Sequence, residues 1–267
     1  MLKGYSYPLS PKGQMNLAPT PPWHYAGDML GVEFWTSTAA AALTLPRGLA
    51  IDPDSKGRLT AIFFDWQFSA AGEEYLDPLR SQYREFLLLV DAMWNDMKVA
   101  WCPYIFVDND ASLARGWIQG FPKKMGLIAQ TRTFGVPGIA APVLGPGGRF
   151  GASASAAGRR LAEAEVILEA PMADSSAFAR PIVNLRYFPQ LVAGKHQEPA
   201  VNQLVMAVLD ELHIDNAWVG KGSLTLPVVP GDEISDLAPI RVGMGFRASI
   251  SYTVRDQRVL ADLRRSQ

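Results

Sequence analysis

This chain has few of the residues that bind metals or form disulfides. Its 267 residues include one cysteine, Cys102, and three widely spaced histidines. A single cysteine cannot form an internal disulfide, which fits a reducing compartment. No metal-ligand spacing is present. The glycine-rich stretch 145–151 lacks the lysine and the Ser/Thr of a phosphate loop. We therefore expect no metal and no cofactor.

The chain also has almost no net charge and no long apolar run. The formal net charge is −1, which argues against nucleic-acid binding and against electrostatic binding to anionic membranes. No apolar run reaches the ~20 residues of a membrane span. Residues 1–8 contain no apolar segment of signal-peptide length. We expect a cytoplasmic protein with no nucleic-acid and no membrane partner.

The composition is that of a folded domain with a large core. Hydrophobic residues make up 48% of the chain and charged residues 19%, so disorder is not expected. Proline-rich residues 1–26 predict an extended N-terminal arm. Many short apolar and aromatic runs are separated by Gly and Pro, and there is one alanine-rich helix candidate at 38–45. This pattern predicts one β-rich α+β domain over residues 1–267.

Two further segments are ambiguous. Residues 83–90 fit a helix or a strand, because periodicity does not settle so short a run. Residues 134–158 are rich in Gly, Ala, Pro and Ser and predict a long connection. Such a connection is either a functional lid or a poorly ordered excursion.

The most informative motif is Gly-Phe-Pro-Lys-Lys-Met-Gly at residues 120–126. Burial and a neighbouring cation both favour the neutral form of a lysine and lower its pKa. A neutral amine can condense with a ketone to a Schiff base. If residues 117–123 are extended, Gln119 and Lys123 share one face and Lys124 points the other way. The alternative is that the two lysines lie in an exposed turn.

Two more side chains are candidates for the same site. In an extended segment 83–90, Glu85 shares a face with Tyr83 and Leu87, where a desolvated carboxyl could move protons. The alternative is an ion pair between Glu85 and a nearby arginine. Tyr252 lies on an apolar face of segment 248–254, and its hydroxyl is either a substrate contact or part of the core. We expect Cys102 to be a buried apolar residue of the core rather than a nucleophile.

The lysine motif resembles the signature of the acetoacetate decarboxylase-like superfamily, aromatic-Pro-Lys-Lys-apolar-Gly. Three other stretches resemble the family in the same order: Val107–Asp110 with Arg115, Arg180–Leu185, and Ala217–Gly220. The resemblance covers residues 20 to 255. It implies a largely antiparallel β cone or barrel with a few flanking helices, in homo-oligomers. It also implies that Lys123 forms the Schiff base, that Lys124 is its adjacent lysine, and that Glu85 is an active-site acid.

The chain departs from the family pattern at two places. The stretch 25–29 lacks the arginine that helps decarboxylases with the substrate carboxylate, and 59–61 lacks a second acid. We therefore expect a Schiff-base lyase that condenses a small oxo acid such as pyruvate with an aldehyde and removes water. Lys123, Glu85 and Lys124 form the expected catalytic set, and Gln119 and Tyr252 are expected to hold the substrate.

Two alternatives remain open. One is decarboxylation of acetoacetate or another 3-oxo acid, with Arg115 or Arg186 in place of the missing arginine. The other is a non-catalytic protein that binds a small molecule on the same scaffold.

Overall fold

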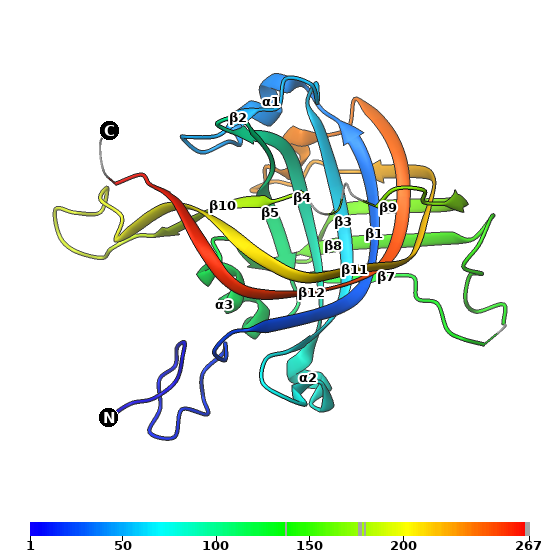
Figure 1. The fold of residues 1–267 in the computed structure, drawn as a ribbon. Coiled ribbons are helices and arrows are strands. Elements are labelled where there is room, and N and C mark those ends of the chain that lie inside the picture. Colours follow the sequence, from blue (N-terminus) through cyan, green and yellow to red (C-terminus); the bar gives the residue numbers. More distant parts are fainter. Residues whose placement is uncertain (137, 176–177, 179, 265–267) are drawn as a thin grey trace.

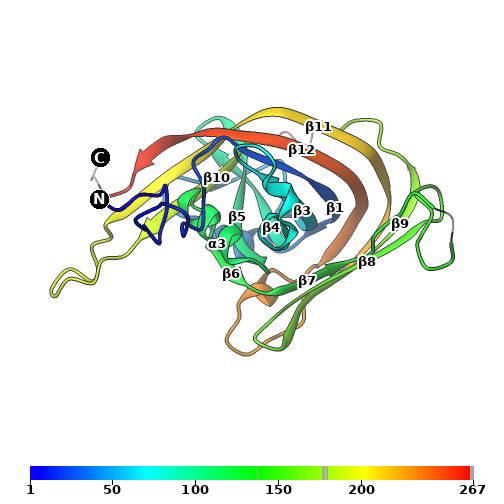
Figure 2. The same cartoon turned by 90° about the horizontal axis from the view of Figure 1, so that it is seen from below.

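The computed structural model describes residues 1–136, 138–175, 178 and 180–264. A 12-stranded sheet includes ten strands in the order β10-β5-β4-β3-β1-β12-β11-β9-β8-β7. The other two strands lie off this path: β2 pairs with β4, and β6 pairs with β5. Strand β10 also pairs with β11. That extra pairing closes β10, β5, β4, β3, β1, β12 and β11 into a ring. The strands β7, β8 and β9 extend from one side of this ring (Figures 1 and 2). The β-rich, largely antiparallel fold with few helices is confirmed.

The bounds of the elements are as follows. The strands of the ring are β1 (Trp23–Trp35), β3 (Arg58–Ser69), β4 (Gln82–Trp94), β5 (Met97–Val107), β10 (Ile182–Phe188), β11 (Val201–Thr225) and β12 (Arg241–Asp262). The other strands are β2 (Ala50–Ile51), β6 (Lys123–Met125), β7 (Leu127–Gln130), β8 (Arg149–Ala156) and β9 (Arg159–Pro171). The helices are α1 (Thr38–Leu43), α2 (Pro78–Ser81) and α3 (Asp110–Ile118), with 3-10 turns η1 (Glu74–Leu76) and η3 (Ile234–Leu237). No helix in these described ranges has the length and apolar character to cross a membrane.

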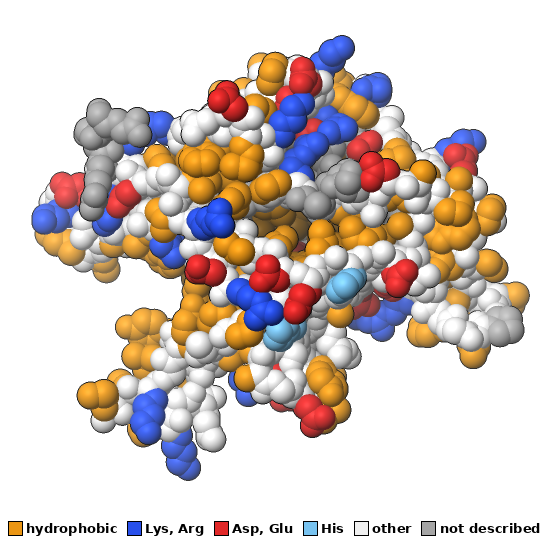
Figure 3. All heavy atoms as spheres, viewed as in Figure 1, with side chains coloured by type: hydrophobic (Ala, Val, Ile, Leu, Met, Phe, Trp, Pro, Cys, Tyr) orange, Lys and Arg blue, Asp and Glu red, His pale blue; other side chains and the backbone are white. Residues whose placement is uncertain are grey.

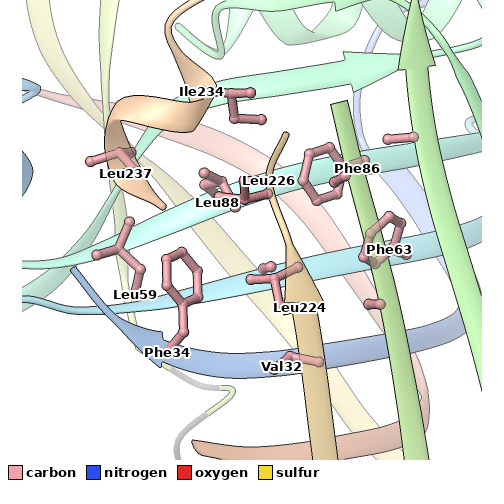
Figure 4. Close-up of a cluster of buried hydrophobic side chains, with 14 of the residues drawn as sticks. Val32, Phe34, Leu59, Phe63, Phe86, Leu88, Leu224, Leu226, Ile234 and Leu237 are labelled. Atoms are coloured by element: carbon pink, nitrogen blue, oxygen red, sulfur yellow. The ribbon is translucent and has the colours of Figure 1, made fainter. Parts of the chain in front are cut away.

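The strands β1, β3, β4 and β5 bury side chains on both of their faces, whereas much of β11 and β12 is only partly buried. Because side chains alternate along a strand, even-numbered residues of β1 face outward. There they join a hydrophobic core beneath β8 and β9, which includes Phe34, Phe63 and Phe86. Leu224 at the end of β11, Leu226 just after it and Ile234 of η3 complete this core (Figure 4). The opposite faces point into the ring and form a second cluster rich in aromatic side chains.

Helix α3 was not expected from the sequence. The Asn109 side chain accepts a hydrogen bond from the backbone N–H of Ser112 at 2.8 Å and caps the helix. Gly120, with a φ of 81°, follows its C-terminal end. The prediction of an extended segment before the lysines is therefore wrong over residues 117–120, because 117 and 118 are helical and 119 and 120 form a turn. Asp108-Asn109-Asp110 is a turn that also starts a helix.

The structure also settles the limits of three other segments. Residues 83–90 form part of β4, which settles the helix-or-strand ambiguity. The long connection expected over 134–158 ends earlier, because β8 begins at Arg149. The extended N-terminal stretch gives way to β1 at Trp23.

Candidate active site

A cavity of about 570 Å³ lies inside the ring. It is lined by inward-facing residues of β1, β3, β4, β11 and β12 and, from the segment before and at the start of β10, by residues 172–174, 178 and 180–182. Strand pairing arranges these side chains in rows across the sheet. Met29, Phe64 and Glu85 form one row, and the next row contains Ile62 and Leu87. The space-filling view shows a hollow rimmed by hydrophobic side chains (Figure 3).

Strand β6 brings Lys123 into this cavity. It pairs in parallel with β5, with Lys123 opposite Ile105 and Lys124 opposite Phe106. The Trp117 indole N–H donates to the Lys123 carbonyl at 3.0 Å and fixes the strand against α3. The Lys123 side chain is only 7% exposed, so the exposed turn considered from the sequence is wrong for this residue.

Lys123 and Glu85 form a buried ion pair. The Lys123 Nζ lies 2.6 Å from the Glu85 Oε2, and it donates to the Ser112 Oγ at 3.0 Å. The Trp66 indole N–H approaches the other Glu85 oxygen at 3.4 Å. The alternative of an ion pair between Glu85 and a nearby arginine is therefore wrong, because Arg84 pairs with Asp65 and Asp108 instead.

The pKa of Lys123 lies below its usual value. Burial is the largest cause, the Glu85 carboxylate opposes it, and the Arg115 guanidinium adds to the lowering. The cation that adds to the lowering is thus Arg115 of α3. A larger share of Lys123 is therefore neutral near neutral pH than for a lysine in water, as a carbonyl nucleophile requires.

Lys124 points out of the cavity, as strand alternation predicted. Its side chain is 62% exposed, and its Nζ lies 3.4 Å from the Asp232 Oδ2. The Nζ also lies 5.3 Å from the centre of the Phe106 ring. These contacts connect β6 to Phe106 of β5 and to Asp232 in the segment before η3. Both contacts lie on the side of β6 that faces away from the cavity.

Gln119 and Tyr252 both line the cavity. The Gln119 side-chain amide donates to the Arg115 carbonyl at 3.2 Å. Tyr252 pairs across the sheet with Tyr25, and the two ring centres are 5.1 Å apart. Burial raises the pKa of Tyr252 well above its ordinary value. Its hydroxyl therefore stays protonated and can donate a hydrogen bond.

Sequence reasoning named Arg115 and Gln119, but it missed Ser112 and Gly116 and the helix that relates the four residues. They recur at helical spacing along α3 and its C-cap, and they face the site. Ser112 is fully buried and Arg115 is 2% exposed. Within the described ranges, the Arg115 Nε and Nη2 have no hydrogen-bond partner. The signal that could have located this face is the Asn109 cap, because it sets the start of the helix.

Arg115 is held between aromatic rings. Its Cζ lies 3.6 Å from the centre of the Phe68 ring and 5.6 Å from that of Tyr83. Its hydrogen bond and charge lower the pKa of Tyr25, although burial raises that pKa more. Arg186, the other candidate cation, is instead held by Gln203 and Gln257 and does not line the cavity.

The outer end of the cavity carries charged groups. Asp91 bridges two arginines: the Arg58 Nε lies 2.6 Å from its Oδ2, and Arg180 pairs with its Oδ1. The Glu33 carboxylate is 3.8 Å from Arg58. The side chains of Arg58, Glu33 and Arg180 are 23–31% exposed, whereas Lys123 and Glu85 are almost fully buried. We call Glu33, Arg58, Asp91 and Arg180 the charged rim.

No group of three or more His, Cys, Asp or Glu within the described part of the chain is arranged to hold a metal ion. Among these residues, the groups available for chemistry are an amine, a carboxylate, a guanidinium and several hydroxyl and amide groups.

Comparison with known families identifies the scaffold. The family model for acetoacetate decarboxylase matches residues 6–263. The chain belongs to the acetoacetate decarboxylase family. The resemblance at the lysine motif is thus confirmed, and it extends over nearly the whole chain.

Solved structures of this family superpose closely on the model. The enduracididine biosynthesis enzyme MppR, complexed with the condensation product of pyruvate and imidazole 4-carboxaldehyde, is 36% identical with a TM-score of 0.91. The match covers 98% of each chain. MppR complexed with pyruvate is 35% identical, covers 98% of this chain and 99% of its own, and has a TM-score of 0.90.

A more distant member of the family shares the fold. An acetoacetate decarboxylase-like enzyme from Sphingomonas wittichii RW1 is 22% identical, covers 98% of this chain and 100% of its own, and has a TM-score of 0.89. A comparison with curated proteins found no match.

Proposed function

We propose that this protein is a Schiff-base lyase that condenses pyruvate, or a closely related 2-oxo acid, with an aldehyde and removes water. The observation that carries the proposal is the Lys123 amine. It is buried, its pKa is lowered, and it lies 2.6 Å from the Glu85 carboxylate in a cavity of about 570 Å³. The similarity to MppR, which was solved with pyruvate and with a pyruvate–aldehyde condensation product, supports the choice of substrate.

Iminium formation starts the reaction. The neutral Lys123 amine attacks the ketone carbon of pyruvate, and the oxygen leaves as water after it takes up protons. The resulting iminium withdraws electrons from the adjacent methyl group. Glu85, in contact with the amine, removes a methyl proton and leaves an enamine. Ser112 holds the Nζ from the other side.

The new carbon–carbon bond follows. The enamine carbon attacks the aldehyde carbon, and the aldehyde oxygen takes a proton to become a hydroxyl. Loss of a second proton from the attacking carbon and departure of the hydroxyl as water create a carbon–carbon double bond. Hydrolysis of the iminium regenerates Lys123. The net reaction turns pyruvate and an aldehyde into an unsaturated 2-oxo acid and one water.

The substrate carboxylate is assigned to the inner end of the cavity. Gln119 and Tyr252 offer an amide and a hydroxyl there. Arg115 supplies positive charge behind them, with two N–H groups that lack a partner in the described structure. A buried donor without a partner costs about 1–3 kcal/mol, so pairing with a carboxylate would recover that cost. Lys124 is assigned to holding β6 in place from outside.

Decarboxylation of a 3-oxo acid is the competing reaction. Segment 25–29 of β1 provides no arginine to the cavity, which disfavours it. The third hypothesis, a non-catalytic binding protein, requires that Lys123 titrate near the unperturbed value of ~10.4.

Borohydride trapping tests the proposal directly. The protein is reduced in the presence of pyruvate, and peptides are analysed by mass spectrometry. The expected result is a pyruvate adduct on Lys123 and none in Lys123→Met. Proton NMR with pyruvate and acetaldehyde should then show the unsaturated 2-oxo acid. Absence of the adduct, or carbon dioxide from acetoacetate without any condensation product, would overturn it.

A further inference from the structure

The cavity is much longer than a three-carbon acid requires. Alternate residues of β4, from Tyr83 and Glu85 through Leu87 and Leu89 to Asp91, all line it. At about 3.4 Å per residue, the strand advances roughly 20 Å between Glu85 and Asp91. A volume of about 570 Å³ is typical of sites that enclose drug-sized ligands. Pyruvate at the Lys123 end would leave most of this space to its reaction partner.

The space between Glu85 and the charged rim has apolar walls. One row across the sheet consists of Phe246, Gly31, Ile62 and Leu87. A Cβ on Gly31 would lie 2.5 Å from the Phe246 Cε2, so the glycine makes room for the ring to lie across β1. The Phe178 ring, 5.0 Å from that of Phe246, adds a second aromatic surface.

The polar side chains that β1, β3 and β4 contribute to the cavity lie at its two ends, and Asp174 and Asn184 line it as well. Gln119, Tyr252 and Arg115 are at the inner end, where the proposed function assigns them to pyruvate. Beyond the apolar row, Leu89 shares a row with Thr60 and Glu33, and the charged rim follows. A polar aldehyde body lying beside Phe246 and Leu87 would lose its hydration without gaining hydrogen-bond partners.

We propose that the second substrate is an aldehyde with an extended apolar body, which lies along Ile62, Leu87, Leu89 and Phe246 and reaches the charged rim. This inference rests on the proposed function, because it names the partner of the enamine formed on Lys123. An aryl or straight-chain alkyl group fits the walls. A polar substituent is tolerated only at the far end, beside partly exposed Arg58 and Glu33.

A chain-length series tests the class of aldehyde. Rates of condensation with saturating pyruvate are measured for straight-chain aldehydes from acetaldehyde to octanal. The expected result is a rise in kcat/KM of up to about fourfold per methylene, the factor corresponding to about 0.8 kcal/mol per buried CH₂. The rise should level off once the chain reaches the rim. Glyceraldehyde should react no faster than acetaldehyde.

Variants locate the effect in the cavity. Leu89→Gln places an amide in the apolar wall, and the ratio of kcat/KM for octanal to that for acetaldehyde should fall at least tenfold. Leu89→Trp keeps the wall apolar but narrows the passage and should lower the same ratio. Leu43→Gln is the matched control, because Leu43 lies on α1 and is exposed. It should leave the ratio unchanged.

The outcomes separate this inference from the proposed function. If Lys123 is trapped by pyruvate and acetaldehyde condenses, but rates are flat or fall along the series, the apolar-aldehyde inference is wrong and the lyase proposal stands. An unchanged ratio in both Leu89 variants would overturn the inference as well. If pyruvate gives no adduct, the proposed function itself fails.

Discussion

Lys123 lies directly against Gly116 of α3. A Cβ built on this glycine would lie 2.6 Å from both Cγ and Cε of Lys123. The absence of a side chain at residue 116 therefore gives the lysine its path to Glu85. Gly116 has no positive φ in the structure, so the close approach explains the glycine without any backbone requirement.

Gly116→Ala should displace the reactive amine. Alanine favours a helix by about 1 kcal/mol over glycine, so the fold should be retained while the lysine is pushed aside. A displacement of about 1 Å can cost roughly 100-fold in rate, and we expect a loss of that size in borohydride trapping. Gly135→Ala is the control, since a Cβ there meets nothing within 4 Å. Unchanged trapping in Gly116→Ala would contradict this account.

Glu85→Gln should separate proton transfer from iminium formation. The carboxylate favours the Lys123 ammonium, so its removal should lower the pKa of Lys123 further. Since the neutral amine is the nucleophile, the midpoint of the pH profile of trapping should move to lower pH. Condensation should still slow by about 100-fold or more without the proton carrier. A midpoint that moves to higher pH would refute the assignment, and Glu165→Gln, at an exposed acid, serves as the control.

The Lys123–Glu85 pair should stabilise the fold less than its contact distance suggests. Removing one member of a buried pair costs about 3–5 kcal/mol, whereas replacing both is often neutral or stabilising. Lys123→Met and Glu85→Gln should each lower the urea midpoint, and the double variant should recover most of the loss. The exposed pair of Arg149 and Glu165 gives the comparison, with an expected coupling of about 0–1 kcal/mol. Additive losses at the buried pair would rule out this account.

Arg115 should determine affinity for the substrate carboxylate. Arg115→Lys keeps the charge but loses the forked donors, and Arg115→Met loses both. The pyruvate concentration for half-maximal trapping should rise about tenfold in the first and more in the second. Acetone, a ketone without a carboxylate, should be trapped with little change in Arg115→Lys, which keeps the charge. Arg115→Met should slow acetone trapping as well, because the Arg115 charge helps to lower the pKa of Lys123, but its loss should be smaller than the loss for pyruvate. Equal losses for pyruvate and acetone in Arg115→Lys would contradict a role in carboxylate binding.

Lys124 should contribute through its contact with Asp232. Lys124→Met and Asp232→Asn remove the same ion pair, in which the Lys124 side chain is 62% exposed and the Asp232 side chain 12%. Lys124→Met should cost about 0–1 kcal/mol of stability. Asp232→Asn should cost more, because the Asp232 Oδ1 also accepts a hydrogen bond from the Ile234 N–H. Both should leave the pyruvate adduct on Lys123. If Lys124→Met alone abolished trapping, the charge of Lys124 would act on the reaction directly.

The sequence predicted the site best where one strand carries the signal. Glu85 and Tyr252 could be placed on inward faces because alternation along a strand needs no tertiary information. Lys123 and Lys124 were assigned to opposite sides correctly, although the segment before them is partly a helix. Helix α3 was not predicted from the sequence because it is short and its hydrophobic pattern is weak. Its start was visible only in the turn at 108–110.

The buried partners of Lys123 could not be found in the same way. Ser112 and Gly116 are ordinary residue types, and their role arises only when α3 packs against β6. The closure of the ring by β10 and β11 is a long-range pairing that no local pattern encodes. The cavity and its charged rim depend on that closure. Their position could therefore be located only in the folded structure.

The shape of the cavity also constrains the kinetics. Its amine lies deep and its partly exposed charged groups lie at the rim, with the apolar row that contains Phe246 and Leu87 between them. Under the proposed function, an aldehyde that arrived first would fill the space between the rim and Lys123 and shut pyruvate out. We therefore expect compulsory-ordered turnover, with the oxo acid entering before its partner. Excess aldehyde should act as a dead-end inhibitor competitive with pyruvate.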